Sequence, residues 1–204
     1  MTELTLPHAV GLLMLDPESG KPRTAEGTAK IVLAAAVAEA AVRGAVTFDG
    51  TKVVLVDPTP VGDTTTDSVL ERLAGSGPHY LRNLLTSADL TFDESRRPDA
   101  VVVRELDAAG HVTVSRSSVL RRVLAVPAGN RAAELSGQVS AAVDAGEITA
   151  RMAALISILA TFDLLRAVVG QPLDQRRRDN VAAIRQSSPV GTALAGAMRE
   201  ISVP

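Results

Sequence analysis

The stretch TAEGTAKIVLAAAVAEAAVR, residues 24–43, decides the centre of the predicted fold. It has the pattern of a helix, and Gly44 directly after it suits the position just past a helix C-terminus. From Ile31 to Val37 the side chains are apolar nearly all round the helix, whereas a surface helix carries a polar face. We therefore expect a buried, central helix.

A second stretch, TARMAALISILATFDLL at residues 149–165, has the same character. It has few polar positions, so we expect it to be central too, with Met152–Leu159 and Ile31–Val37 buried against each other or in a shared core. Its longest apolar run, near Met152–Phe162, is well short of the ~20 residues that span a bilayer.

The rest of the chain predicts further helices and two hairpins. Strand-like runs flank Asp49-Gly50 in AVTFDGTKVVLVD, and HVTVSRSSVLRRVLAVP at 111–127 predicts a second hairpin. Helices are expected from about Thr64–Thr66, near 78–85, from Pro98 to Gly110, from Asn130 to about Asp144, and near 179–186 and 190–201. The predicted fold class is mainly α: a single helical domain over residues 1–204, with buried central helices and small β hairpins.

Composition narrows the class of protein. The chain has 204 residues, 46% hydrophobic and 22% charged, which is enough for one globular domain with a sizeable core. Aromatic residues make up only 2%, so Ala, Val and Leu must fill that core, and this favours closely packed helices. A net charge of −2 argues against an overall positive electrostatic potential that would attract nucleic acid.

Two further features concern cellular context. There is no cysteine, which excludes disulfides, thiolate metal sites and cysteine nucleophiles. The opening MTELTLPHAV has no basic segment followed by a long apolar run, so we expect no signal peptide and a cytoplasmic protein.

Motifs for catalysis or metal binding are absent from the sequence. The three histidines, His8, His79 and His111, are widely separated, no Gly-rich loop has phosphate-binding spacing, and no serine lies in a nucleophile elbow. Asp57, Asp63 and Asp67 cluster in one loop, and we interpret them as turn and N-cap residues, with a catalytic or metal group as the alternative. We therefore expect no metal, no cofactor and no enzyme activity.

The segment 98–126 resembles the order of a winged-helix module. A helix precedes a hairpin that carries Arg116, Arg121 and Arg122, as in a basic wing on DNA. The helix itself offers only Arg104 among valines, alanines and acids, whereas a recognition helix exposes several base-reading side chains. We favour a hairpin that covers the core, and nucleic-acid binding remains an alternative.

The stretch RAVVGQPLDQRRR, residues 166–178, places an apolar turn between positive charges. One interpretation is a loop packed on a neighbouring helix, followed by a solvated helix start. Three arginines at a helix start are, however, unfavourable against the helix dipole. This indicates that an interaction outside the helix accounts for them. The other interpretation is a shallow membrane contact, in which the apolar tip enters the bilayer and the arginines meet lipid phosphates.

Five stretches in order resemble the Golgi phosphoprotein 3 family, in particular its short bacterial members. The stretches are VGLLMLDPESGKP, AVAEAAVRGAVTF, VVLVDPTPVGDTTTDSVLERL, LDAAGHVTV and RMAALISILATFDLL, spread over about residues 8–186. The PTPVGD loop and the order of the five are the most specific features. The resemblance implies a mostly helical fold and a peripheral membrane protein that is not an enzyme.

The resemblance also implies a membrane site. In eukaryotic members of the family, the head group of phosphatidylinositol 4-phosphate lies in a basic pocket, a nearby apolar hairpin enters the bilayer, and the proteins can oligomerise. The hairpin corresponds here to RAVVGQPLDQRR. We therefore expect Val168, Val169, Pro172 and Leu173 to contact the membrane at an exposed tip, with Arg166, Arg176 and Arg177 at its base binding anionic head groups.

The lipid pocket of the family is not retained in the sequence. Its aromatic and basic positions fall on Thr24, Leu33, Glu147 and Ala150 in an ungapped alignment, and nearby Lys30 and Arg151 are the candidate substitutes. We therefore expect an anionic membrane surface as the partner, with little selectivity for phosphatidylinositol 4-phosphate. A soluble protein-interaction module that uses the same apolar segment is the alternative. Whether the protein forms homo-oligomers is left open by the sequence.

Overall fold

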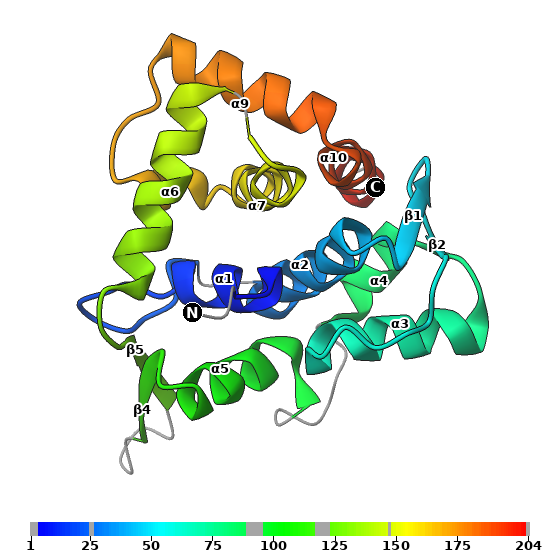
Figure 1. The fold of residues 1–204 in the computed structure, drawn as a ribbon, viewed down its shortest axis with the longest axis horizontal. Helices are drawn as coiled ribbons and strands as arrows, with labels where there is room; N and C mark the ends of the chain where they lie inside the picture. The colour runs from blue at the N-terminus through cyan, green and yellow to red at the C-terminus, as the bar shows by residue number, and fades with distance from the viewer. Residues whose placement is uncertain (1–3, 25–26, 89–95, 117–122, 147, 203–204) are drawn as a thin grey trace.

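The central helix is observed where the sequence predicts it. The computed structural model describes residues 4–24, 27–88, 96–116, 123–146 and 148–202. In it, α2 (Thr28–Val42) runs through the middle of the molecule with other helices on both sides (Figure 1). Every side chain from Ala29 to Ala40 except Lys30 is buried, and α2 lies between two glycines with positive φ, Gly27 and Gly44. The boundaries follow from these glycines, because left-handed backbone cannot continue a helix.

The second apolar stretch forms α7 (Ala150–Thr161), which packs against α2. Ala153–Leu159 are all buried, and Met152 is half-buried. Thr149 caps the helix by accepting a hydrogen bond from the backbone N–H of Met152 at 3.2 Å. The prediction of two central helices that share one core is confirmed.

The other helices surround this pair. On one side of α2 are α3 (Thr64–Ser76), α4 (Leu81–Ser87) and α5 (Pro98–Ala108), as Figure 1 shows. On the other side, α6 (Arg131–Ala145), α9 (Gln175–Ser187) and α10 (Pro189–Ser202) enclose α7, and the short α8 (Leu165–Val169) follows α7. The N-terminal α1 (Leu6–Leu13), where we predicted no helix, packs on α2 and α5.

Two small antiparallel sheets complete the fold. The first has the order β1-β2-β3, with β1 (Val46–Asp49), β2 (Lys52–Leu55) and β3 (His79–Tyr80). Asp49 pairs with Lys52, so the loop is Gly50-Thr51, and Gly50 supplies the positive φ that this turn needs. The second sheet pairs β4 (Val112–Arg116) with β5 (Val123–Pro127). Both predicted hairpins and the mainly α fold class are confirmed; Arg121 and Arg122 lie outside the described residues.

Among the described residues, every helix is too short or too polar to cross a bilayer.

Candidate functional site

The segment after α7 does not form the predicted hairpin. Phe162 ends α7, Asp163 has φ 55°, α8 makes a short helix, and Gly170 ends it with φ 70°. Leu165 and Val168, three residues apart on α8, are both buried. The prediction of an exposed tip that includes Val168 is therefore wrong.

Helix α6 accounts for the burial of Val168. The Ser136 hydroxyl on α6 donates a hydrogen bond to the Val168 carbonyl, and α8 packs on α6 and α7. The apolar face of α8 thus points into the protein. Of the apolar residues predicted to contact membrane, Val169 and Leu173 are half-buried against the core and Pro172 is exposed. The loop 170–172, between α8 and Leu173, is exposed.

The arginines of this segment have different environments. The Arg177 guanidinium pairs with the Asp144 carboxylate on α6, at 2.7 Å and 2.8 Å, and only 15% of the Arg177 side chain is exposed. The hydrogen bond between the two side chains lowers the pKa of the Asp144 carboxyl group. The same hydrogen bond raises the pKa of the Arg177 guanidinium. Arg166, by contrast, is exposed, and no described residue hydrogen-bonds or pairs with its guanidinium.

This geometry explains the arginine run at the start of α9. Asp174 caps the helix by accepting from the Arg177 backbone N–H at 2.8 Å. The Arg176 guanidinium lies 3.4 Å from the Asp144 carbonyl, in the last turn of α6, where the helix dipole favours a positive charge. Positive charges at the N-terminus of α9 are unfavourable against the dipole of that helix. The contacts of Arg176 and Arg177 with the C-terminal turn of α6 offset this cost.

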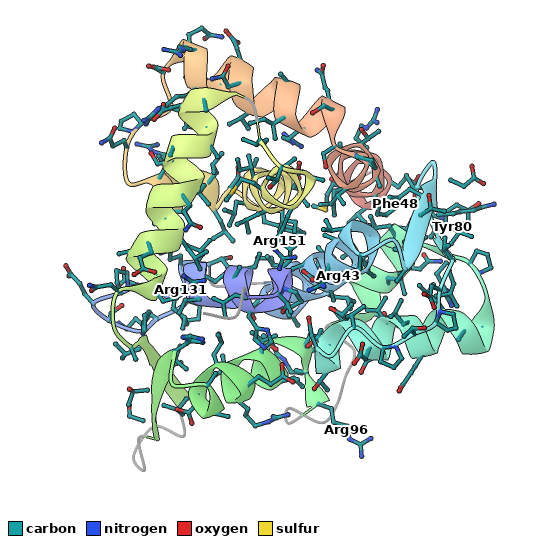
Figure 2. The ribbon with its side chains drawn as sticks, in the orientation of Figure 1. Arg43, Phe48, Tyr80, Arg96, Arg131 and Arg151 are labelled. Atoms are coloured by element: carbon teal, nitrogen blue, oxygen red, sulfur yellow. The ribbon has the colours of Figure 1, made fainter. Side chains whose placement is uncertain are left out.

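Arg151, a predicted head-group ligand, is part of a buried ion-pair network. Its guanidinium contacts both carboxylate oxygens of Glu39, at 2.9 Å and 3.1 Å, and donates to the Leu4 carbonyl. Arg43 donates to the same carboxylate at 3.0 Å and the Leu6 backbone N–H donates at 2.8 Å. Figure 2 shows Arg151 between α7 and α2. Arg151 therefore joins α7, α2 and α1.

The charge of Glu39 depends on this network. Its side chain is fully buried, and burial by itself raises the pKa of a carboxyl group. The hydrogen bonds from Arg151, Leu6 and Arg43 exceed this effect and lower the pKa of Glu39 below its ordinary value of 4.5. Glu39 is thus an ionised, buried residue of the central helix. Lys30, the other candidate substitute, lies half-buried in the first turn of α2.

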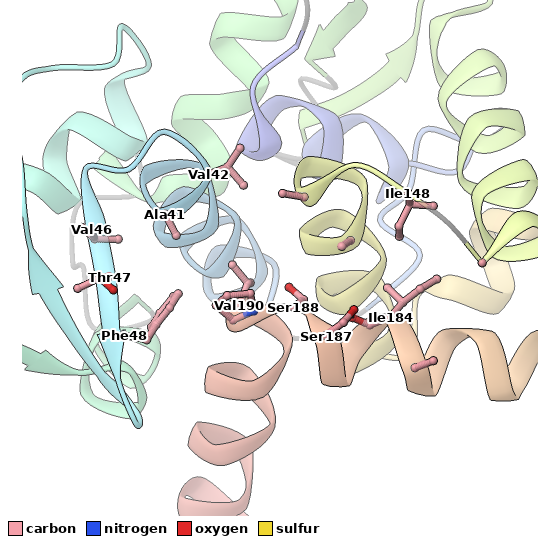
Figure 3. A pocket seen from close by; sticks show the side chains of 15 residues that line it. Ala41, Val42, Val46, Thr47, Phe48, Ile148, Ile184, Ser187, Ser188 and Val190 are labelled. Atoms are coloured by element: carbon pink, nitrogen blue, oxygen red, sulfur yellow. The ribbon is translucent and has the colours of Figure 1, made fainter.

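A cavity of about 710 Å³ opens at the C-terminal end of α2. Its walls come from the end of α2, from β1, from the start of α7 and from the junction of α9 and α10 (Figure 3). Phe48 and Ile184 lie on different walls, and the lining is otherwise mostly Ala, Val and Ile, with hydroxyls from Thr47, Ser187 and Ser188. Sequence reasoning missed this cavity because elements far apart in the sequence build its walls and none of them carries a motif.

The carboxylates of the 57–67 loop have the structural roles that we predicted. Within the described part of the chain, no group of three His, Asp or Glu side chains is arranged to hold a metal ion. Asp57 accepts from the Thr59 N–H, Asp63 from those of Thr65 and Thr66, and Asp67 from those of Val61 and Gly62.

Comparison with known proteins then decides the family. A family model described as Golgi phosphoprotein 3 (GPP34) matches residues 6–201, which is nearly the whole chain. The chain belongs to the Golgi phosphoprotein 3 family. A search of curated proteins gave no match. Membership is consistent with a non-catalytic adaptor.

Two of the positions that the ungapped alignment assigns to the lipid pocket of the family, Leu33 and Ala150, line different cavities in this member. Leu33 lines a small cavity of about 200 Å³ with Thr65 and Arg72, between α3, α4 and α5. Ala150 lines the separate 710 Å³ cavity at the start of α7. Glu147 lies outside the described residues. Leu33 and Ala150 thus belong to two different cavities.

Proposed function

We propose that this Golgi phosphoprotein 3 family member is a non-catalytic, cytoplasmic adaptor that associates peripherally with anionic membranes. Membership of the family supports the general class. The observation that carries the membrane site is the exposed loop 170–172 next to the exposed, unpaired Arg166 among the described residues. Pro172 at the surface and Leu173 just beneath it are the apolar groups nearest to an approaching bilayer.

The expected contact is weak. Fully burying a Val or Leu contributes ~1.5–3 kcal/mol, and Val169 and Leu173 are already half-buried in the protein, so they add only part of that. Each arginine near an anionic surface adds about 1 kcal/mol. Arg177 is largely neutralised by Asp144, so Arg166 and Arg176 carry most of the attraction. Several copies on one membrane are needed for stable binding.

Flotation with anionic liposomes tests this proposal. We expect wild-type protein to float at low salt, and Arg166→Ser combined with Leu173→Asp to remain in solution with an unchanged melting temperature. Arg104→Ser, which removes an exposed arginine of α5, is the matched control and floats like wild type. Equal flotation of wild type and the double variant contradicts the site, and a wild type that does not float favours the protein-interaction alternative.

Lipid selectivity is the second part of the test. Because Leu33 and Ala150, two of the aligned pocket positions, are apolar and line two different cavities, we expect equal flotation with phosphatidylinositol 4-phosphate and with other anionic lipids at matched charge. A clear preference for phosphatidylinositol 4-phosphate would overturn this expectation.

A further inference from the structure

The cavity of about 200 Å³ between α3, α4 and α5 lies on the opposite side of α2 from α7 (Figure 1). Its apolar lining includes Leu33 from α2, Val69 from α3, Leu84 from α4 and Val101 from α5. The volume is below the ~300–1,000 Å³ that is typical of pockets for drug-sized ligands. This cavity therefore suits a small molecule that has an apolar part.

The charge of the lining distinguishes this cavity from two larger ones. The 710 Å³ cavity has no charged side chain among the described residues that line it. A cavity of about 590 Å³ beside α5 is lined by two arginines and two aspartates. The 200 Å³ cavity is lined by Arg72 and Arg96, and by no carboxylate among the described residues. Its lining therefore favours an anion.

Arg72 is positioned to pair with such an anion. Its guanidinium donates a hydrogen bond to the Ser87 hydroxyl at 2.8 Å, and Ser87 lines the same cavity. Within the described part of the chain, no carboxylate pairs with Arg72. A guanidinium presents several N–H donors in a fork that matches the two oxygens of a carboxylate, so the bond to Ser87 leaves donors for a ligand.

The hydroxyl of Thr65 has no partner. Among the hydroxyls that line the cavity, those of Thr64, Ser68 and Ser87 donate hydrogen bonds within the protein. Thr65 is buried, and no described residue hydrogen-bonds to its Oγ1. Rotation about χ1 exchanges this oxygen with the methyl group, and threonine in a helix adopts both rotamers. A ligand in the cavity that Thr65 lines can therefore supply the missing partner.

Thr65 and Arg72 can act on one ligand. They lie about two turns apart on the same face of α3, which is ~10 Å along the helix axis. Side chains in a helix lean toward its N-terminus, so the long side chain of Arg72 extends toward Thr65 and shortens this distance.

We propose that the cavity between α3, α4 and α5 binds a small organic carboxylate. The carboxylate pairs with the Arg72 guanidinium, and the Thr65 hydroxyl donates to one of its oxygens. The hydrocarbon part of the ligand contacts Leu33, Leu84 and Val101.

A carboxylate fits this lining better than a phosphate group does. A phosphate monoester carries more negative charge and presents three acceptor oxygens, so it needs a larger set of donors. The apolar side chains of the lining would leave some of these oxygens without partners. A carboxylate has only two oxygens, which Arg72 and Thr65 are sufficient to bind.

The inference goes beyond the proposed membrane contact and does not depend on it. The family resemblance assigns no role to Arg72 or Thr65. Binding of a small carboxylate is measured in solution without lipid, so failure of the liposome experiment leaves it unaffected.

Isothermal titration calorimetry with hexanoate tests the inference. Two control ligands each keep one part of hexanoate: 1-hexanol has the hydrocarbon without the charge, and acetate has the carboxylate without the hydrocarbon. The titrations use one low ionic strength, because salt screens the charge of an exposed arginine. We expect saturable binding of hexanoate and at least about tenfold weaker binding of either control.

Two arginine variants test the charge. Arg72→Gln removes the guanidinium of an exposed residue, so we expect an unchanged melting temperature and about a tenfold loss of affinity for hexanoate. Arg104→Gln is the matched control, because Arg104 is exposed on α5 and lines the 590 Å³ cavity instead. We expect it to change the affinity less than about twofold.

Thr65→Val separates a ligand contact from a structural role. The substitution keeps the shape of the side chain and removes the hydroxyl that has no partner among the described residues. We expect the melting temperature of the free protein not to decrease, because no hydrogen bond is lost, and the affinity for hexanoate to fall by about threefold. A lower melting temperature with unchanged affinity contradicts the role of Thr65.

Two tryptophan variants of α3 locate the ligand. Ser68 is exposed and lines the cavity, so Ser68→Trp fills it from the rim. Ala74→Trp places the same side chain at an exposed position of α3 that does not line the cavity. We expect about a tenfold loss of affinity for the first variant and less than about a twofold change for the second.

Four outcomes overturn the inference. The first is no saturable binding of hexanoate to the wild-type protein, and the second is equal binding of 1-hexanol, which makes the cavity a purely apolar one. The third is an equal loss of affinity in the two arginine variants or in the two tryptophan variants. The fourth is displacement of hexanoate by inorganic phosphate at lower concentration than by acetate, which assigns Arg72 to a phosphate group.

Discussion

Arg151→Met is the most informative single substitution. It removes both guanidinium contacts to Glu39 and keeps the length of the aliphatic side chain. The Glu39 side chain is 0% exposed and that of Arg151 is 18% exposed, so the remaining carboxylate stays buried with fewer partners. Removing one member of a buried pair costs ~3–5 kcal/mol, and the hydrogen bonds from Arg43 and Leu6 that remain favour the lower value. At about 2–4 °C per kcal/mol for a chain of this size, the melting temperature falls by ~6–12 °C.

Thermal unfolding at neutral pH measures this effect. Arg43→Met is the matched control: its side chain is 52% exposed, so its pair with Glu39 is solvent-screened and contributes at most about 1 kcal/mol. Arg151→Met melting within about 2 °C of wild type would refute the structural role of the pair. Loss of liposome flotation without loss of stability would instead make Arg151 a head-group ligand, as the sequence suggested.

The same network predicts a pH dependence. The folded-state pKa of Glu39 lies below its ordinary value of 4.5, so its contribution to stability is fully present above about pH 4.5 and is lost as the pH falls through the folded-state pKa. We expect the wild-type melting temperature to decrease below pH 4.5. Glu39→Gln cannot lose a charge, so its melting temperature, lower at neutral pH, falls less steeply in acid. Parallel curves for the two proteins would contradict this assignment.

Four further substitutions test the packing. Val168→Asp buries a charge without a partner, so we expect it to lower the melting temperature by several degrees. Leu173 is half-buried, so Leu173→Asp should change the melting temperature little. Equal effects of the two variants in thermal unfolding would contradict the burial of α8. Leu155→Asp places a charge in the core of α7 and abolishes the cooperative folding transition seen by circular dichroism. Gly191→Ala brings a Cβ within 2.4 Å of the Arg185 carbonyl oxygen, so we expect a lower urea midpoint, and an unchanged midpoint would show that the α9–α10 junction relaxes freely.

The sequence predicts the elements whose signals are local. The sequence predicts that Ile31–Val37 is buried because no polar face is present, and a helix without a polar face has no stable position at the surface. Asp63 and Pro98 mark helix starts by their own chemistry, and Gly110 marks an end by its positive φ. These residues act within a few positions of themselves, so one sequence suffices to interpret them.

Features that depend on distant residues are not predictable in this way. Helix α1 has only eight residues, and its first free N–H, on Leu6, is satisfied by Glu39, thirty-three positions later. Glu39 in turn pairs with Arg151 at the start of α7. In the sequence, Glu39 is a single polar residue in an apolar run, and no pattern indicates its partner. The 710 Å³ cavity is hidden for the same reason, since its walls come from separate elements.

The segment 166–178 shows how one pattern fits two structures. Apolar residues flanked by arginines suit a membrane finger, and they equally suit a short helix whose apolar face packs inside while its arginines bind a neighbouring helix end. Residues of α6 decide between them: Ser136 holds the Val168 carbonyl and Asp144 pairs with Arg177. Among the described residues, Arg166 and the loop 170–172 are exposed and have no partner on α6. In the proposed membrane contact these residues are therefore the ones free to face lipid, and substitutions at Val168 or Arg177 would act through stability.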